Sequence, residues 1–214
     1  IIIVSVLFFI ATFAVKAQFD TQLSNYWAVM NYFNPASAGY SGKLELSALY
    51  RLQWLGGTSA PKSAVVVGDM PLKLGSKHHG VGISMYNDQI GLFKSTVLSG
   101  QFSYKMKLFG GDLGIGLQVG YINESFDGSK VLLPDNIGEG ESGGNSGNTG
   151  GDETFPGKDT SGSSFDGALG FFYSKPKWYI GLSATHLTAP KLELEENIIL
   201  EIPRSYYFTA GYNI

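Results

Sequence analysis

The feature that most constrains the fold of this chain is a two-residue alternation that runs through long segments. Residues 111–126 show it most cleanly, with leucine, isoleucine, valine and tyrosine at one set of positions and mainly glycine and glutamine at the other. Successive side chains of a β-strand point to opposite faces, so this pattern predicts strands with one apolar and one polar face. It predicts eight strands, over residues 43–54, 60–72, 79–88, 93–108, 111–126, 165–175, 177–187 and 204–214.

The length of these strands favours a membrane barrel over a soluble β-sandwich. Roughly ten to twelve residues at about 3.3 Å each span about 35 Å. Tilted by about 40°, such strands cover the ~25 Å apolar band of an outer-membrane barrel, whereas soluble sandwiches use strands of about five or six residues. Short links also alternate with long ones at 127–164 and 187–203. We therefore predict an all-β, antiparallel outer-membrane β-barrel with at least eight strands.

The two faces of each strand should then lie in different surroundings, lipid on one side and the lumen on the other. In the first strand we expect lipid to meet the apolar set Leu44, Leu46, Tyr50, Leu52 and Trp54. An unpaired arginine on the lipid side would cost about 2–4 kcal/mol at the bilayer midplane, so the polar set faces the lumen. The predicted lumen-facing residues are Glu45, Arg51, Gln53, Gln101 and Lys105. Gly114, Gly116 and Gly120 also point inward, where they would admit a plug or close packing.

Composition argues against several classes of function. The formal net charge is -3 and there is no cysteine, so neither a nucleic-acid partner nor a thiolate metal site is expected. The three histidines are His78, His79 and His186. A lipase-like site would need one of them beside a serine and a carboxylate, and the sequence places no acid to orient either His79 with Ser84 or His186 with Ser183. We expect no enzyme, no cofactor and no metal.

The chain begins with an apolar run that reads as an export signal. Residues 1–17 end in Val15-Lys16-Ala17, and small residues at the last and third-last positions suit a signal peptidase. The alternative is a membrane anchor, although the run is short of the ~20 residues that span a bilayer as a helix. The initiator methionine and basic segment that usually precede such a run are missing, so we expect a sequence truncated at its start.

One long connection has a composition of its own. Residues 127–164 are rich in glycine and serine and contain seven acidic residues and two lysines. Such a segment buries too little apolar area to offset its ordering entropy, so a flexible acidic loop is expected. A calcium site is the alternative, but the spacing of the acids matches no ligand pattern.

Four ordered stretches give the chain a family resemblance. They are QLSNYWAVMNYFNPASAGYSG, LYRLQWLGGTSAPKS, GVGISMYNDQIGLFKSTVLSGQFSYKMKL and YIGLSATHLTAPKL. Together they resemble the PorP/SprF family, in which a Tyr-Arg-x-Gln-Trp segment and an Asn-Asp-x-Ile-Gly hairpin follow an Asn-Pro-Ala-x-Ala-Gly motif. The matches cover most of residues 18–214 and lie in the family's order.

The resemblance implies an outer-membrane component of the type IX secretion system of gliding and related bacteria. Its members act in export or surface attachment of secreted proteins such as gliding adhesins. The implied partners are outer-membrane lipid, a secreted substrate with a C-terminal sorting domain, and periplasmic components of the machine. On this basis residues 18–42 are a periplasmic or plug-like segment and 43–214 a barrel that is incomplete at its C-terminal end.

Two motifs of the resemblance are candidate partner-binding residues, and each has a simpler structural interpretation. Asn34, Pro35, Ala36 and Gly39 either form a turn or dock a partner or plug the lumen. Asn87, Asp88 and Gly91 either supply loop chemistry or contact a partner. Two rival functions stay open: a general diffusion porin, which would conduct ions without a partner, and a secreted β-sandwich adhesin, which would be soluble without detergent.

Overall fold

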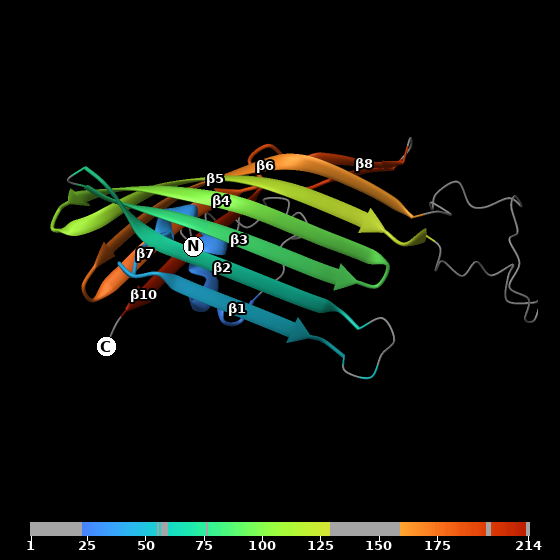
Figure 1. Ribbon diagram of the computed structural model, residues 1–214, viewed down its shortest axis with the longest axis horizontal. Coiled ribbons are helices and arrows are strands. Elements are labelled where there is room, and N and C mark those ends of the chain that lie inside the picture. The colour runs from blue at the N-terminus through green and yellow to red at the C-terminus, as the bar shows by residue number, and fades with distance from the viewer. Residues whose placement is uncertain are drawn as a thin grey trace, which may run out of the picture.

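The computed structural model describes residues 23–54, 56, 60–75, 77–128, 159–195 and 198–212. One antiparallel sheet of eight strands dominates it (Figure 1). In sheet order these are β1 (Glu45–Leu52), β2 (Lys62–Leu74), β3 (Lys77–Ile90), β4 (Phe93–Leu108), β5 (Gly111–Phe126), β6 (Thr160–Lys175), β7 (Trp178–Thr185) and β10 (Ser205–Tyr212). The predicted antiparallel sheet of eight long strands is thus confirmed, while the predicted signal peptide lies outside the described residues.

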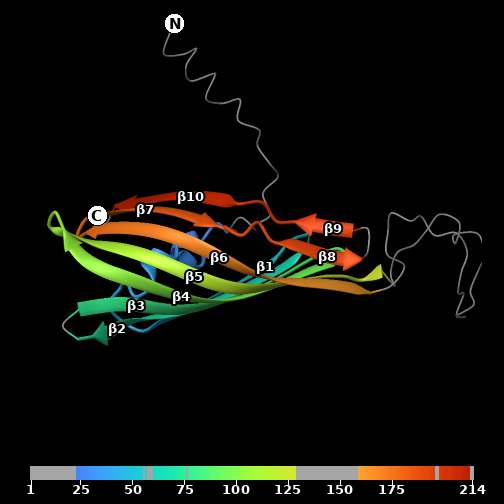
Figure 2. The same cartoon turned by 90° about the horizontal axis from the view of Figure 1, so that it is seen from above.

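The sheet curls into a half-barrel whose two ends differ (Figures 1 and 2). The turns β2–β3, β4–β5 and β6–β7 lie at one end, which we call the short-turn end. The connections β1–β2, β3–β4, β5–β6 and β7–β10 lie at the other, the loop end. In outer-membrane barrels short turns are periplasmic and long loops extracellular. None of the helices in the described part of the chain is long and apolar enough to cross a membrane.

The convex face of the half-barrel is apolar over most of its height. Large side chains point outward and are exposed there, among them Leu46, Tyr50, Ile83, Leu117 and Phe208. A contiguous apolar surface of this extent marks an interaction with lipid or protein. Among the described side chains of the eight-stranded sheet, the outward-facing charged residues lie at strand ends, at Lys62, Lys94 and Lys175.

A row of polar side chains marks the edge of this apolar band nearer the loop end. Asn87, Thr96, Asn123 and Ser163 are consecutive cross-strand partners on the convex face. From this row towards the short-turn end, the outward-facing residues of β4 run from Leu98 to Leu108 and are all apolar, glycine or tyrosine. Ten intervals of about 3.3 Å, tilted by about 40°, give a height of about 25 Å. This height matches the hydrocarbon band that outer-membrane barrels cross.

Two segments predicted as loop are strands in the structure. Residues 160–164, assigned to the flexible loop, form the first part of β6 and pair with β5, because backbone bonding continues where serine and glycine give no apolar alternation. In the predicted link 187–203, β8 (Lys191–Glu195) and β9 (Ile198–Glu201) form a hairpin. Leu192 and Leu194 bury that hairpin against the rest of the protein. The remainder of the acidic loop, residues 129–158, lies outside the described residues.

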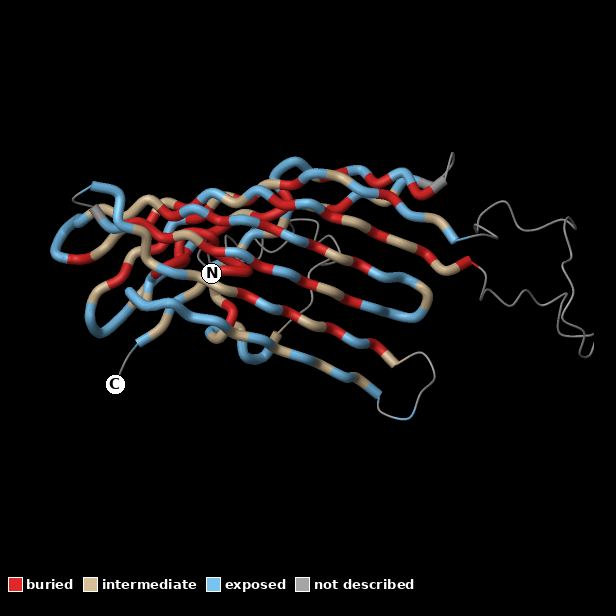
Figure 3. Tube along the Cα trace, viewed as in Figure 1, coloured by how far each residue is buried: buried red, intermediate tan, exposed pale blue. Residues whose placement is uncertain are grey.

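The concave face is filled by the segment that precedes β1. This segment contains η1 (Tyr26–Val29), α2 (Met30–Phe33) and η2 (Pro35–Ser37), and we call residues 23–42 the plug segment. Figure 3 shows buried residues alternating with exposed ones along the central strands, and residues 31–39 of the plug segment are all buried. A single apolar cluster joins Val29, Tyr32 and Phe33 of the plug to Val65, Val67, Tyr86, Val97 and Ile122 of the sheet and to Leu192 and Ile202.

Candidate functional site

Asn34 is the residue by which the plug segment contacts the sheet most directly. Its side-chain Oδ1 accepts a hydrogen bond from the Ala36 N–H at 3.0 Å, which caps the short helix η2. Its Nδ2 donates to the backbone oxygens of Phe171 in β6 and Leu182 in β7, at 3.1 and 3.4 Å. Because Asn34 is only 1% exposed, this one amide joins the turn to two strands in a water-poor site.

Three further hydrogen bonds hold the same segment across the half-barrel. The Ser103 hydroxyl of β4 donates to the Ala36 oxygen at 2.8 Å, and the Ser183 hydroxyl of β7 donates to the Phe33 oxygen at 2.7 Å. On the opposite side, the Gly39 N–H donates to Asp69 of β2 at 2.5 Å. Strands far apart in the sheet are therefore tied to one short turn.

Glycines of the sheet make room for this turn. A Cβ at Gly80 would overlap the Ala38 oxygen, a Cβ at Gly116 would overlap the Ala36 nitrogen, and a Cβ at Gly170 would overlap the Asn34 side chain. A Cβ at Gly114 would lie 2.7 Å from the Ala36 oxygen, whereas the nearest atoms to a Cβ at Gly120 belong to the sheet itself. The inward-pointing glycines thus form a groove in the sheet that takes the backbone of the plug.

The predicted partner-binding residues at the N-terminal motif are therefore buried rather than displayed. Asn34, Pro35, Ala36 and Gly39 are all buried where the plug packs on the concave face, and Ala36 and Gly39 also border a cavity at the short-turn end. Gly39 has a φ of +65°, and a Cβ there would also meet the Met70 oxygen at 2.9 Å. Positive φ and close approach together explain why glycine occupies this position.

The second predicted partner-binding group is split between the two faces of the sheet. Asn87 points outward and donates to the Thr96 hydroxyl at 2.9 Å. Asp88 points inward, is buried, and accepts from the Ser63 hydroxyl at 2.6 Å. Gly91 lies in the exposed β3–β4 turn with a φ of +60°. The structure does not bring these three residues into one site.

The predicted lumen-facing residues lie on the concave side but in different surroundings. Gln101 is buried, with its Nε2 donating to Ser84 at 3.0 Å and to Gln118 at 3.1 Å. Arg51 and Gln53 are half-buried towards the loop end, whereas Glu45 is exposed at the short-turn end. Lys105 is half-buried and borders a cavity at the short-turn end. The plug segment packs among these residues, with its Asn31 amide 3.4 Å from the Gln101 oxygen and its apolar side chains in the cluster.

An acid–histidine pair that sequence reasoning missed lies at the start of the β7–β8 connection. Asp166 of β6 contacts His186 Nδ1 at 2.6 Å and accepts from the Thr188 hydroxyl at 2.9 Å. The expectation that no acid is placed to orient His186 was therefore wrong, because β6 and β7 are neighbours in the sheet. The Ser183 hydroxyl is committed to the Phe33 oxygen, so this serine does not complete a nucleophile–base pair. The pair fastens the connection to the sheet.

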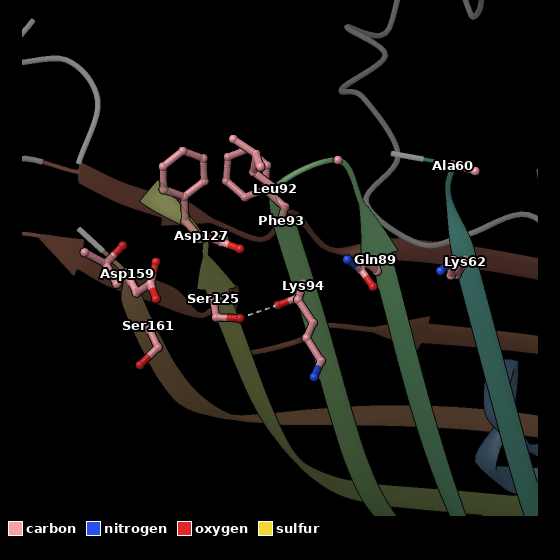
Figure 4. A pocket seen from close by; sticks show the side chains of 13 residues that line it. Ala60, Lys62, Gln89, Leu92, Phe93, Lys94, Ser125, Asp127, Asp159 and Ser161 are labelled. Carbon is pink, nitrogen blue, oxygen red and sulfur yellow. Dashed lines mark hydrogen bonds between the residues drawn. The ribbon is translucent and has the colours of Figure 1, made fainter. Parts of the chain in front are cut away.

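A second cavity, of about 460 Å³, lies at the loop end (Figure 4). Lys62, Gln89 and Lys94, which are cross-strand partners on the convex face, extend their side chains along it. Asp127 and Asp159 border the same cavity beyond the strand ends. Its charges are mixed and its wall continues the polar edge of the convex face, so it belongs to the boundary between membrane and solvent.

Comparison with known proteins connects this geometry to a family. The family model described as type IX secretion system membrane protein PorP/SprF matches residues 15–214. Comparisons with curated proteins and with solved structures found no match. The match covers the plug segment, all the strands and the connections between them. The chain therefore belongs to the PorP/SprF family of type IX secretion system membrane proteins.

Proposed function

We propose that this protein is an outer-membrane component of type IX secretion that recognises exported proteins and assists their export or attachment to the cell surface. The observation that carries this proposal is the family match over residues 15–214. The apolar convex face, about 25 Å high and limited towards the loop end by a row of polar side chains, supports a location in the outer membrane. Secreted proteins with a C-terminal sorting domain, gliding adhesins among them, are the proposed substrates.

The packing of the concave face favours recognition over conduction. A diffusion porin needs a water-filled lumen lined by polar side chains. Here the plug segment occupies the concave face, and Val29, Tyr32 and Phe33 join the apolar cluster of the strands. The role is accordingly non-catalytic, with the loop end meeting the exported protein and the short-turn end meeting periplasmic components of the machine.

The test is recovery of the full-length, tagged protein from a native-like host. Membranes are fractionated and solubilised in detergent, and the proteins that copurify with the tag are identified. We expect recovery from the outer membrane together with a secreted protein that carries a C-terminal sorting domain. Outer-membrane recovery without such a protein, combined with steady conductance in planar bilayers, would instead establish the porin. Recovery from the soluble fraction would exclude the membrane assignment.

A deletion strain tests the role itself. Loss of the gene should reduce the amount of the copurifying protein on the cell surface and leave the periplasmic level of an unrelated exported protein unchanged. Normal surface display in the deletion strain would contradict the proposed function.

A further inference from the structure

The short-turn end of the concave face holds a cavity of about 650 Å³ beside the plug segment. Its walls come from the ends of β2, β3, β4 and β5, from β6, and from the plug residues Ala36, Gly39 and Tyr40. Several of these wall residues are exposed, so the cavity opens to solvent at the end that faces the periplasm in barrels of this kind.

Strand register brings three basic side chains to one side of this cavity. Lys73 of β2 and His78 of β3 are direct cross-strand partners. The pairing Gly80↔Ser103 places Lys105 of β4 next in the same inward-facing row. All three residues line the cavity, with Lys73 and His78 exposed and Lys105 half-buried. Two ammonium groups and an imidazole thus converge on one space.

The acidic groups near this row are already engaged. Asp112 lines the cavity, and its carboxylate lies 2.8 Å from Lys107 Nζ. Asp69, two inward-facing positions from Lys73 along β2, accepts the hydrogen bond from Gly39 N–H at 2.5 Å. Glu45, its cross-strand partner in β1, is exposed. Among the described residues, no ion pair joins a carboxylate to Lys73 or Lys105, and Asp69 and Asp112 attract the Lys105 ammonium only from a longer distance. The row therefore has positive charge to offer a ligand.

The opposite wall is aromatic and suits a peptide rather than a bare ion. Tyr40 of the plug packs against Phe172 of β6 with ring centroids 5.0 Å apart, and Phe172 stacks on Tyr179 at 5.2 Å. Tyr40 and Phe172 both line the cavity. Aromatic surface beside fixed cations is a combination that recognises the apolar and the charged parts of one segment together.

We propose that this cavity binds a peptide carboxylate, either a chain terminus or the acidic side chains of a segment, presented from the periplasmic side. Lys73, His78 and Lys105 supply the charge-assisted hydrogen bonds, and Tyr40 with Phe172 supplies the apolar contact. The proposal rests on the proposed function and deepens it, because it names the chemistry by which a periplasmic component of the machine is recognised at the short-turn end. Binding at this site is measurable on the purified protein without any secretion.

The test uses the full-length protein in detergent and short tetramethylrhodamine-labelled peptides, with fluorescence anisotropy as the measurement. A glutamate-rich peptide should bind, and a glutamine-rich peptide of equal length with an amidated terminus should not. The double variant Lys73→Gln, Lys105→Gln should weaken binding of the glutamate-rich peptide by about tenfold or more, with a smaller salt dependence. A glutamine-rich peptide with a free C-terminus tells whether the bound carboxylate is a chain terminus or an acidic side chain. If this peptide binds, the site recognises a chain terminus; if it does not bind, the site recognises acidic side chains.

The matched control is Lys175→Gln, which removes a lysine at the same end of the sheet but on the convex face, 5.8 Å from the Trp178 ring. This variant should bind the glutamate-rich peptide as the wild type does. Equal weakening by Lys175→Gln, or equal affinity for the glutamine-rich amidated peptide, would overturn the proposal. Unchanged binding in the double variant would also overturn it while leaving the secretion role intact. If the purified protein binds the glutamate-rich peptide selectively but deletion of its gene leaves surface display unchanged, the proposed function alone is refuted.

Discussion

Replacement of Gly116 by alanine should displace the plug segment from the sheet. Gly116 faces the turn at Pro35 and Ala36, and a Cβ built there overlaps the Ala36 backbone rather than a movable side chain. The sheet cannot yield locally, because Gly116 pairs with Ser103 and Gly170 on its two sides. The turn must therefore move away from the concave face.

The cost follows from the hydrogen bonds that the movement breaks. Displacement of the turn loses Ser103 to Ala36 at 2.8 Å and Asn34 to Phe171 at 3.1 Å. It also weakens the Ser183 bond to Phe33 at 2.7 Å. At about 1 kcal/mol net for each bond, the free energy of unfolding should fall by about 2–3 kcal/mol. Overpacking without displacement would cost a similar ~1–3 kcal/mol, so a second measurement must report the position of the plug.

Gly100→Ala is the matched control, since Gly100 lies on the convex face of β4 with nothing within 4 Å of its would-be Cβ. Alanine there should be neutral or slightly stabilising, because it restricts the unfolded chain. Urea unfolding in detergent gives the free energies. A cysteine introduced at Ala36, in a chain that has no other cysteine, reports plug position through maleimide labelling. Equal stability of both glycine variants, with Ala36→Cys protected in each, would refute the account of the groove.

Three other outcomes follow from the same structure. In the otherwise unaltered protein, Ala36→Cys should resist maleimide while Tyr40→Cys, at an exposed position, should react at once; rapid labelling of both would mean that the plug does not occupy the concave face. Leu117→Arg, at mid-height on the convex face, should lower the free energy of unfolding in lipid vesicles by about 2–4 kcal/mol, against about 0–1 kcal/mol for Asn123→Arg in the polar row. Equal costs would place the lipid elsewhere. Asp166→Asn should cost about 1–3 kcal/mol, measured by urea unfolding, because it weakens the buried hydrogen bonds to His186 and Thr188, whereas Asp112→Asn at an exposed pair should cost less than about 1 kcal/mol.

The sheet was predictable because each long strand repeats the same local rule many times. β4 and β5 begin and end at the predicted residues 93–108 and 111–126, where alternation runs without interruption. The first part of β6 was not predicted as a strand, because residues 160–164 are serine, threonine and glycine and show no apolar alternation. The hairpin β8–β9 was not predicted, because its strands are only 5 and 4 residues long and are too short to show an alternating pattern.

The contacts of the site were less accessible to sequence reasoning, for a physical reason. That Gly114 and Gly116 point inward follows from alternation, but which backbone they admit depends on a turn some eighty residues earlier in the chain. The pair of Asp166 and His186 is likewise set by the register of β6 with β7 and by the connection that follows. Pairings between distant segments leave no local pattern, since each residue alone suits a surface loop or a strand equally well.

Plug retention and ligand binding at the short-turn cavity must be linked, because they share a wall. Ala36, Gly39 and Tyr40 belong to the plug and also line the cavity, so a displaced plug removes one side of the site. A ligand that binds only when the wall is complete stabilises the seated plug by the free energy of its binding. Conversely, any partner that draws the plug out of the glycine groove must release that ligand. The groove and the basic row are therefore thermodynamically linked, so occupancy at the short-turn end favours the state in which the plug fills the concave face.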